Sequence, residues 1–274
     1  MEIKFNDVSY KTILKNIDIK FLDGQIIGLT GSSGSGKTTL VEMIDALVLP
    51  TSGNVLIGNY KVDNKVKLKN INDLRFNVGL VFENSEEQIF NTTVYNEISF
   101  GMRYFKYKTD QIEKHVKDSL NMVGLSEDYM HKNPFNLSHG ETKKLAIASV
   151  LAFNPEILIL DEPVVALDNR SKKNLIKIIR ALKARYNKTI IIVSQDTDFL
   201  HKVVDYVFVM ADGQIVMEGT KYDVFAKEAE LLNYNVKTPQ LIAFSNLVLA
   251  KKGIKIGYRD EINDLIKDVY RYVK

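Results

Sequence analysis

The chain has 274 residues, 45% of them hydrophobic, which is enough for one large core with or without an appendage. Its 37 basic and 34 acidic residues leave a net charge of +3, so charge gives no reason to expect nucleic acid as a partner. The absence of cysteine excludes disulfides and thiolate metal sites, and apolar runs are strand-sized rather than the roughly 18 residues of a membrane-spanning helix. We therefore expect a cytoplasmic α/β protein that serves a membrane only by docking to other chains.

Strands and helices alternate at both ends of the chain. Alternating apolar and polar residues over the first twenty positions predict two half-buried strands joined near Thr12. A buried strand at 25–30 runs into a Gly/Ser-rich loop and then into a helix at 37–47. Further strands are predicted at 54–57, 78–82, 156–161, 189–194, 206–210 and 215–217, the last two joined by a turn at 211–213.

The middle of the chain is predicted to be helical, from about 91 to 152. An α/β core over residues 1–225 with an inserted helical subdomain accounts for this order of elements. Strand signals stop after about position 226, so 226–274 is predicted to be a C-terminal helical extension. Its apolar stretch 241–249 either pairs with its counterpart in a second subunit, as a dimerisation element, or folds back on its own core, and the sequence leaves both open.

Residues 31–38 read Gly-Ser-Ser-Gly-Ser-Gly-Lys-Thr and fit the phosphate-loop pattern G-x-x-x-x-G-K-[ST] between a strand and a helix. The glycines allow backbone N–H groups to converge on phosphate oxygens. Lys37 is expected at the β- and γ-phosphates of ATP, and the Thr38 hydroxyl at Mg²⁺. A chance match arises in roughly one chain of this length in a hundred. The predicted nucleotide-binding residues are Gly31, Ser32, Ser33, Gly34, Ser35, Gly36, Lys37, Thr38 and Thr39.

Two adjacent carboxylates follow the buried strand that ends near position 160. Asp161 is predicted to lie beside the Mg²⁺ shell, and Glu162 to polarise an attacking water. The alternative is a core strand that merely ends in solvated acids. The phosphate loop makes that alternative the weaker one.

Residues 137–141 read Leu-Ser-His-Gly-Glu and start a helix that runs through position 152. With the loop, the two carboxylates and the stretch 161–168, this segment resembles the ABC ATPases, whose signature is usually LSGGQ. The resemblance covers residues 1 to about 225 and implies a P-loop NTPase (RecA-like) core with an antiparallel β subdomain. It also implies that the helix start at Ser138 faces the γ-phosphate of ATP held by a second subunit. From the residues alone, S-x-x-E is equally the pattern of a plain capping box.

The stretch 78–101 and the C-terminal Thr238-Pro239-Gln240 resemble one branch of that family, the energy-coupling-factor (ECF) ATPases of vitamin and cobalt or nickel uptake. This resemblance implies a second homologous ATPase, a membrane-embedded scaffold protein and a separate substrate-binding membrane protein. It implies a peripheral location at the cytoplasmic face of the cell membrane. Glu86 and Glu87 could accept arginines from a scaffold helix, although exposed acids in a loop are more often solvated.

Three positions around the nucleotide differ from the family. The Q-loop glutamine is Glu83, which can ligate Mg²⁺ but brings a negative charge near phosphates. The switch histidine is Gln195, which can donate a hydrogen bond but cannot carry a proton; losing a charge-assisted bond costs roughly one to two orders of magnitude in rate. His201 is a weak candidate to replace it. The aromatic that stacks on adenine would lie near Thr12, and Tyr10, on the same face of the strand, is the candidate.

The signature segment also departs from the family, with His139 and Glu141 in place of glycine and glutamine. Ser138 and Gly140, which matter most for close approach to a phosphate, are retained. Glu141 at a helix start that faces an anion should weaken the clamp on ATP. Alternatively it simply completes the capping box, and the sequence leaves the two open.

Together with the phosphate loop, the resemblance implies an ATP hydrolase that drives transmembrane transport as a translocase, with Mg-ATP bound between two subunits. A heterodimer is favoured over a homodimer. In this heterodimer the chain's own site would hydrolyse ATP slowly, and a faster site on the partner's loop would be closed by Ser138 and Gly140. The main alternative is a nucleotide-binding subunit with negligible catalysis that acts as a structural clamp. A soluble ABC ATPase acting on DNA or ribosomes would usually carry coiled-coil insertions or metal-binding cysteines, and a phosphotransferase would not need the Ser138 segment.

Overall fold

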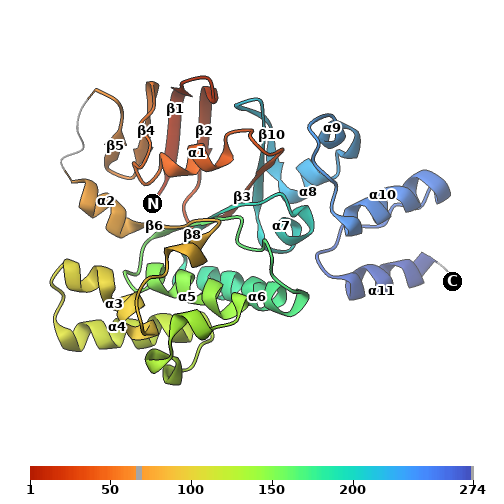
Figure 1. Ribbon diagram of the computed structural model, residues 1–274. Coiled ribbons are helices and arrows are strands. Elements are labelled where there is room, and N and C mark those ends of the chain that lie inside the picture. The colour runs from red at the N-terminus through yellow and green to blue at the C-terminus, as the bar shows by residue number, and fades with distance from the viewer. Residues whose placement is uncertain (66–69, 273–274) are drawn as a thin grey trace.

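The computed structural model describes residues 1–65 and 70–272 as two sheets with helices around them (Figure 1). The strands are β1 (Ile3–Tyr10), β2 (Leu14–Phe21), β3 (Ile26–Gly31), β4 (Ser52–Ile57), β5 (Tyr60–Val62), β6 (Val78–Val81), β7 (Ile157–Asp161), β8 (Thr189–Val193), β9 (Tyr206–Ala211) and β10 (Gln214–Thr220). One sheet has the order β10-β9-β3-β8-β7-β6 and is parallel except for the β9–β10 hairpin. The other, β2-β1-β4-β5, is antiparallel throughout, so the predicted antiparallel subdomain is present.

The helices fall into groups that match the predicted organisation. Between β6 and β7 the chain inserts α3 (Val94–Tyr104), α4 (Thr109–Met122) and α5 (His139–Leu151), as expected for the helical subdomain. No helix in 1–65 or 70–272 is long and apolar enough to cross a bilayer. The remaining helices are α1 (Lys37–Glu42), α2 (Ile71–Asn77), α6 (Asn169–Tyr186), α7 (Thr197–Val203), α8 (Lys221–Phe225), α9 (Glu228–Asn233), α10 (Gln240–Lys252) and α11 (Ile262–Tyr272), with short 3-10 turns η1 (Ser85–Gln88), η2 (Glu127–His131) and η3 (Pro134–Asn136).

The parallel sheet is buried on both of its faces. Every residue of β3, β7 and β8 is buried, as is typical of near-continuous apolar runs in parallel strands. In β8, Ile190 and Ile192 join the core shared with the inserted helices and α6, whereas Ile191 and Val193 join the core shared with the antiparallel sheet and α1. Because these strands pair in parallel, their carboxyl ends meet at one edge of the sheet, beside the start of α1.

The helix after the phosphate loop is shorter than the predicted 37–47. α1 ends at Glu42, and the chain continues in turns with Ala46 in the left-handed region at φ 52°. Arg75 of α2 donates from Nε to the Asp45 carbonyl (3.3 Å) and from Nη2 to the Ala46 carbonyl (3.4 Å). These backbone groups are bound by a side chain distant in sequence, which helical periodicity alone does not reveal.

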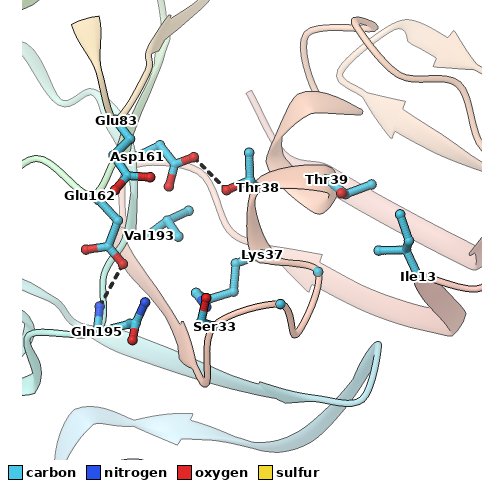
Figure 2. A pocket seen from close by; sticks show the side chains of 12 residues that line it. Ile13, Ser33, Lys37, Thr38, Thr39, Glu83, Asp161, Glu162, Val193 and Gln195 are labelled. Carbon is cyan, nitrogen blue, oxygen red and sulfur yellow. Dashed lines mark hydrogen bonds between the residues drawn. The ribbon is translucent and has the colours of Figure 1, made fainter.

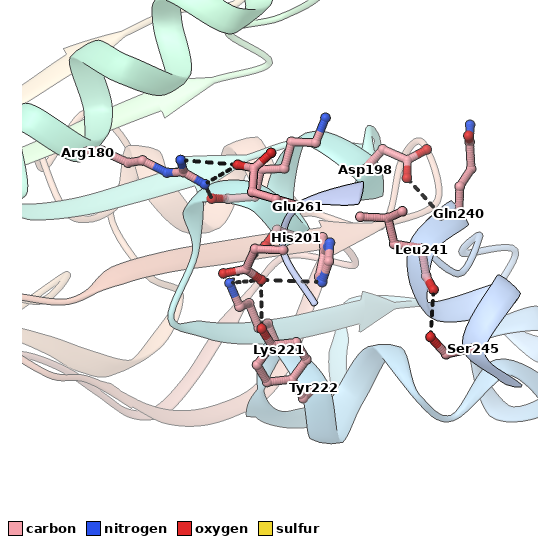
Figure 3. A network of polar contacts seen from close by, with 11 residues as sticks. Arg180, Asp198, His201, Lys221, Tyr222, Gln240, Leu241, Ser245 and Glu261 are labelled. Carbon is pink, nitrogen blue, oxygen red and sulfur yellow. Dashed lines mark hydrogen bonds and ion pairs between the residues drawn. The ribbon is translucent and has the colours of Figure 1, made fainter. Parts of the chain in front are cut away.

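The C-terminal extension is attached to α7 and α8 by polar contacts (Figure 3). Asp260 accepts hydrogen bonds from Lys221 Nζ and Tyr222 Oη, both at 2.7 Å, and lies 3.6 Å from His201 Nε2. At the start of α10 the Gln240 N–H donates to Asp198 at 2.8 Å. The extension is thus held against the helix that begins two residues after Gln195.

One face of α10 folds back on the chain, and another is open. Ile242 and Ser245 are buried, whereas Phe244 and Leu247 are 44% and 50% exposed. Folding back on the protein's own core is therefore confirmed for the first face. Pairing of the 241–249 stretch with a second subunit stays a prediction.

The buried carboxyl of Asp45 should make the stability of the fold depend on pH. Burial raises its pKa to about 7, an effect that the Arg75 guanidinium only partly opposes, and Oδ1 has no hydrogen-bond partner among the described residues. A carboxyl with a higher pKa in the folded than in the unfolded chain destabilises the fold once it ionises, so the penalty grows from about pH 4 to above pH 7.

We expect Asp45→Asn to raise the free energy of unfolding by about 3 kcal/mol at pH 8 and by little near pH 4. Denaturant titrations at both pH values measure this difference. The exposed Asp73 of α2, changed to Asn, is the control and should show no such pH-dependent gain. Equal effects of Asp45→Asn at the two pH values would contradict the assignment.

Candidate functional site

Most of the predicted nucleotide site gathers around one pocket of about 360 Å³ at the carboxyl edge of the parallel sheet (Figure 2). Its walls come from the loop before α1, from the ends of β7 and β8, and from the segment after β6. Residues far apart in sequence thus meet as predicted. The pocket is lined by Ile13, Ser33, Gly34, Gly36, Lys37, Thr38, Thr39, Glu83, Asp161, Glu162, Val193 and Gln195.

The phosphate loop owes its shape to glycines. Gly31 has φ 145°, and a Cβ there would lie 2.1 Å from the Met210 carbonyl oxygen; Gly36 has φ 100°, and its Cβ would lie 2.7 Å from Leu14. Both φ values favour glycine, and at Gly31 any side chain would clash with the backbone of β9. Glycine at these two positions therefore permits the loop to lie close to β9 and β2.

The Lys37 ammonium binds backbone carbonyls of this loop. Its Nζ donates to the carbonyl oxygens of Gly31 (3.0 Å) and Ser32 (2.8 Å) and lies 3.4 Å from Ser35 Oγ. Burial lowers the pKa of Lys37, and the nearby carboxylates of Glu162 and Asp161 oppose that effect. The pocket is therefore not lined by Gly31, Ser32 and Ser35. Instead, these residues hold the Lys37 side chain in position.

Asp161 and Thr38 form a site suited to a hard cation. Thr38 Oγ1 donates to Asp161 Oδ2 at 2.8 Å, and Asp161 Oδ1 is buried without a hydrogen-bond partner among the described residues. Burial raises the pKa of Asp161, because the charged form is desolvated. Mg²⁺ prefers oxygen ligands and is usually held by one or two carboxylates plus phosphates. The donor set therefore fits Mg²⁺, with Glu83 on the same pocket wall.

Glu162 is held in a fixed orientation beside the pocket. Its Oε2 accepts from Ser194 Oγ (3.1 Å) and its Oε1 from the Gln195 N–H (3.0 Å). Its backbone has φ 43°, a left-handed conformation that is uncommon for non-glycine residues. Burial raises the pKa of Glu162, and the bonds from Ser194 and Gln195 oppose that rise. A fixed, partly buried carboxylate of this kind can orient water and accept a proton.

Ser194 is a residue that the sequence reasoning passed over. It is fully buried, and it binds both Glu162 and the N–H of Asp196, at 3.1 Å each. The signal was its place immediately before the switch position, where a hydroxyl can reach the carboxylate at the end of the neighbouring strand. Ser194 therefore fixes Glu162 without touching the pocket.

Lys143 was also passed over, although it links two predicted pieces. This lysine of α5 is buried, and its Nζ donates to the Glu83 carbonyl (2.6 Å) and lies 3.3 Å from Ser85 Oγ. Helical spacing, which places it on the face of Ile147 and Leu151, was the available signal. It attaches the signature helix to the segment that carries Glu83.

The signature segment lies outside this pocket. Ser138 is exposed at the start of α5, and Glu141 Oε2 accepts from its N–H (2.9 Å) and its Oγ (2.7 Å). The capping interaction predicted from S-x-x-E is therefore formed. At Gly140 a Cβ would lie 2.6 Å from Ser171 Oγ of α6, so glycine permits the close packing of these two helix starts.

Two predicted or considered residues are not brought to the pocket. Tyr10 does not line the pocket, whereas Ile13, the residue just before β2, does. The role of Tyr10 in stacking on adenine stays a prediction. His201 is 1% exposed, lies 3.6 Å from Asp260, and is not among the residues that line the pocket with Gln195. His201 therefore does not replace the switch histidine in this structure.

Comparison with known proteins agrees with this geometry. A family model described as ABC transporter matches residues 14–165. The ECF transporter ATP-binding protein EcfA2 of Clostridium perfringens is 39% identical, over 90% of this chain and 86% of that protein; EcfA2 of Staphylococcus aureus strain MRSA252 is 34% identical, over 88% of each. The structure of CbiO1 from Clostridium perfringens, part of the ABC transporter complex CbiONQ, superposes with a TM-score of 0.77 at 31% identity, covering 89% of this chain and 98% of that one.

The matched region contains the phosphate loop, both carboxylates and the signature helix, and the similarity to EcfA2 of Clostridium perfringens extends over 90% of the chain. Fold, site geometry and similarity over nine-tenths of the sequence lead to the same assignment. The chain belongs to the ABC transporter ATPases and, within them, to the ATP-binding proteins of energy-coupling-factor transporters.

Proposed function

We propose that this chain is the ATP-binding and ATP-hydrolysing subunit of an ECF importer for a micronutrient. It would act at the cytoplasmic face of the cell membrane, as a peripheral subunit, with a second homologous ATPase, a membrane-embedded scaffold and a substrate-binding membrane protein. The observation that carries the proposal is the single pocket that joins the phosphate loop to Asp161, Glu162 and Gln195. The names of the relatives support the transport role.

The binding step rests on three side chains. Lys37 would exchange its contacts with loop carbonyls for the β- and γ-phosphates, because an ammonium is better neutralised by phosphate than by a carbonyl. Thr38 and Asp161 would hold Mg²⁺ together, and Glu83 would complete the carboxylates around it. Mg²⁺ supplies neutralisation of the phosphate charge that develops in phosphoryl transfer.

The hydrolytic step rests on Glu162 and its supports. The bonds from Ser194 and Gln195 aim the carboxylate, so that it can orient a water and accept its proton. The Gln195 side chain extends toward the phosphate loop (Figure 2) and would donate a hydrogen bond to a γ-phosphate oxygen. It supplies no charge, so we propose that ATP on this chain's own loop is hydrolysed slowly.

A dimer of such chains has two composite nucleotide sites. We propose a heterodimer in which the faster site lies on the partner's phosphate loop and is closed by Ser138 and Gly140 of this chain. Residues 1–225 would form the nucleotide-binding domain, and 226–274 would contribute to dimerisation through the exposed apolar face of α10. Glu87, which is exposed, would receive a basic helix of the scaffold, while the side chain of Glu86 lies outside the described residues.

A second candidate is a structural clamp that binds nucleotide without hydrolysis. The absence of a histidine at position 195 and the carboxylate at position 83 favour it. The orientation of Glu162 by two hydrogen bonds disfavours it, because a clamp has no need for an aimed carboxylate.

ATPase assays on the purified chain and on the complex purified from membranes test this proposal. We expect two hydrophobic proteins and a homologous ATPase to co-purify, and turnover per chain to be at least tenfold higher in the complex. Glu162→Gln should lower the slow turnover by the purified chain, whereas Glu156→Gln, an exposed acid just before β7, should not. Brisk turnover by the isolated chain would contradict the asymmetry, and an unchanged rate with Glu162→Gln would favour the clamp.

Ser194→Ala tests how Glu162 is controlled. Burial raises the pKa of Glu162, and loss of the Ser194 bond removes a group that opposes the rise. The pKa should therefore increase further, and the acidic limb of the pH profile of kcat should move to higher pH. We expect kcat of the purified chain at neutral pH to fall about tenfold, with KM for ATP little changed.

Ser119→Ala is the matched control, because Ser119 is equally buried but donates only to the Val116 carbonyl of its own helix. It should leave the pH profile in place. An acidic limb of Ser194→Ala that coincides with that of the unmodified chain would show that Ser194 does not act on Glu162.

A further inference from the structure

The start of α5 binds a carboxylate of the chain itself, that of Glu141. The Glu141 carboxylate accepts from the Ser138 N–H (2.9 Å) and the Ser138 hydroxyl (2.7 Å) through Oε2, and from the Tyr129 hydroxyl through Oε1. Ser138 is exposed at this point, and Gly140 brings the helix start against Ser171. Three donors, two from Ser138 and one from Tyr129, thus converge on the Glu141 carboxylate.

A hydroxyl has one proton to donate. Since Ser138 Oγ directs it to Glu141, the same proton is not available to a phosphate oxygen. A phosphate that approaches this helix start must also come close to the negative charge of Glu141, which repels it. Tyr129 and Ser138 hold the pKa of Glu141 down to about 2, so protonation does not remove the charge at working pH.

We propose that Glu141 is an internal competitor for the phosphate-binding face of this chain's signature helix, so that it weakens closure of the dimer on the partner's ATP. Tyr129 is a positioning residue that keeps the carboxylate over Ser138. Closure then requires the Ser138 hydroxyl to turn from Glu141 to the γ-phosphate. The inference rests on the proposed function, because it presupposes a nucleotide held by a second subunit.

A purely structural role for Glu141 predicts the opposite result. If the carboxylate only caps α5, its loss frays the helix start and weakens everything that the helix binds. Glutamine at this position keeps an acceptor for the Ser138 N–H but removes the charge. The two roles therefore differ in the sign of the effect of Glu141→Gln.

The test measures Mg-ATP-driven association by sedimentation velocity. It uses the full chain carrying Glu162→Gln, both alone and mixed with the ATPase subunit that co-purifies with it, and that subunit carries the matching substitution so that hydrolysis is slowed at both sites. We expect Glu141→Gln to lower the protein concentration at half-association by about tenfold, with an unchanged melting temperature. Adding Ser138→Ala should cancel that gain. Glu113→Gln, which removes an exposed acid of α4, is the charge-matched control and should leave association unchanged.

Tighter association with Glu141→Gln, reversed by Ser138→Ala, supports the inference. Weaker or unchanged association with Glu141→Gln overturns it, while leaving the proposed function in place provided that Ser138→Ala alone still weakens the dimer. If Mg-ATP drives no association in either setting, for any variant, the sandwich dimer itself is contradicted, and the inference falls with it.

Discussion

The burial of opposite charges at the end of the parallel sheet is the constraint on which the site depends. Lys37, Asp161 and Glu162 are each less than a tenth exposed and lie around one pocket. Buried charges are tolerated only when they are paired or held by hydrogen bonds. Loop carbonyls, Thr38 and Ser194 provide those bonds, and the fully buried strands β3, β7 and β8 keep the groups in place. A phosphate with its cation can enter this arrangement because it replaces one set of charge partners with another.

Much of this was predictable from local patterns. The loop at 31–38 and the carboxylates at 161–162 follow buried strands, so their meeting at one sheet edge follows from parallel pairing. The residues that the sequence did not reveal act over long distances in the chain. Ser194 reaches Glu162 from the end of a neighbouring strand, and Arg75 binds carbonyls in the turns after α1, about thirty residues away. Such contacts depend on tertiary packing, which single-sequence periodicity does not contain.

In the proposed dimer, the departures from the family pattern fall on both halves of the composite site. Gln195 and Glu83 would alter the half that holds ATP, and Glu141 would alter the half that closes on a partner's ATP. In the structure the two halves are joined within the chain, because Lys143 ties the signature helix to the Glu83 carbonyl. A change at one half is thereby positioned to affect the other, which suits a subunit specialised for one role in an unequal pair.

The central claim is that one nucleotide is shared between two chains. A crystal structure of the complex with Mg-ATP, in which Glu162→Gln and the matching substitution in the partner ATPase slow hydrolysis at both sites, tests it most directly. The account predicts that the nucleotide on the partner's phosphate loop contacts Ser138 and Gly140 of this chain, and that a second nucleotide lies on Lys37 and Thr38. A structure in which α5 of this chain starts far from any nucleotide, with each ATP enclosed by one subunit alone, would contradict the account.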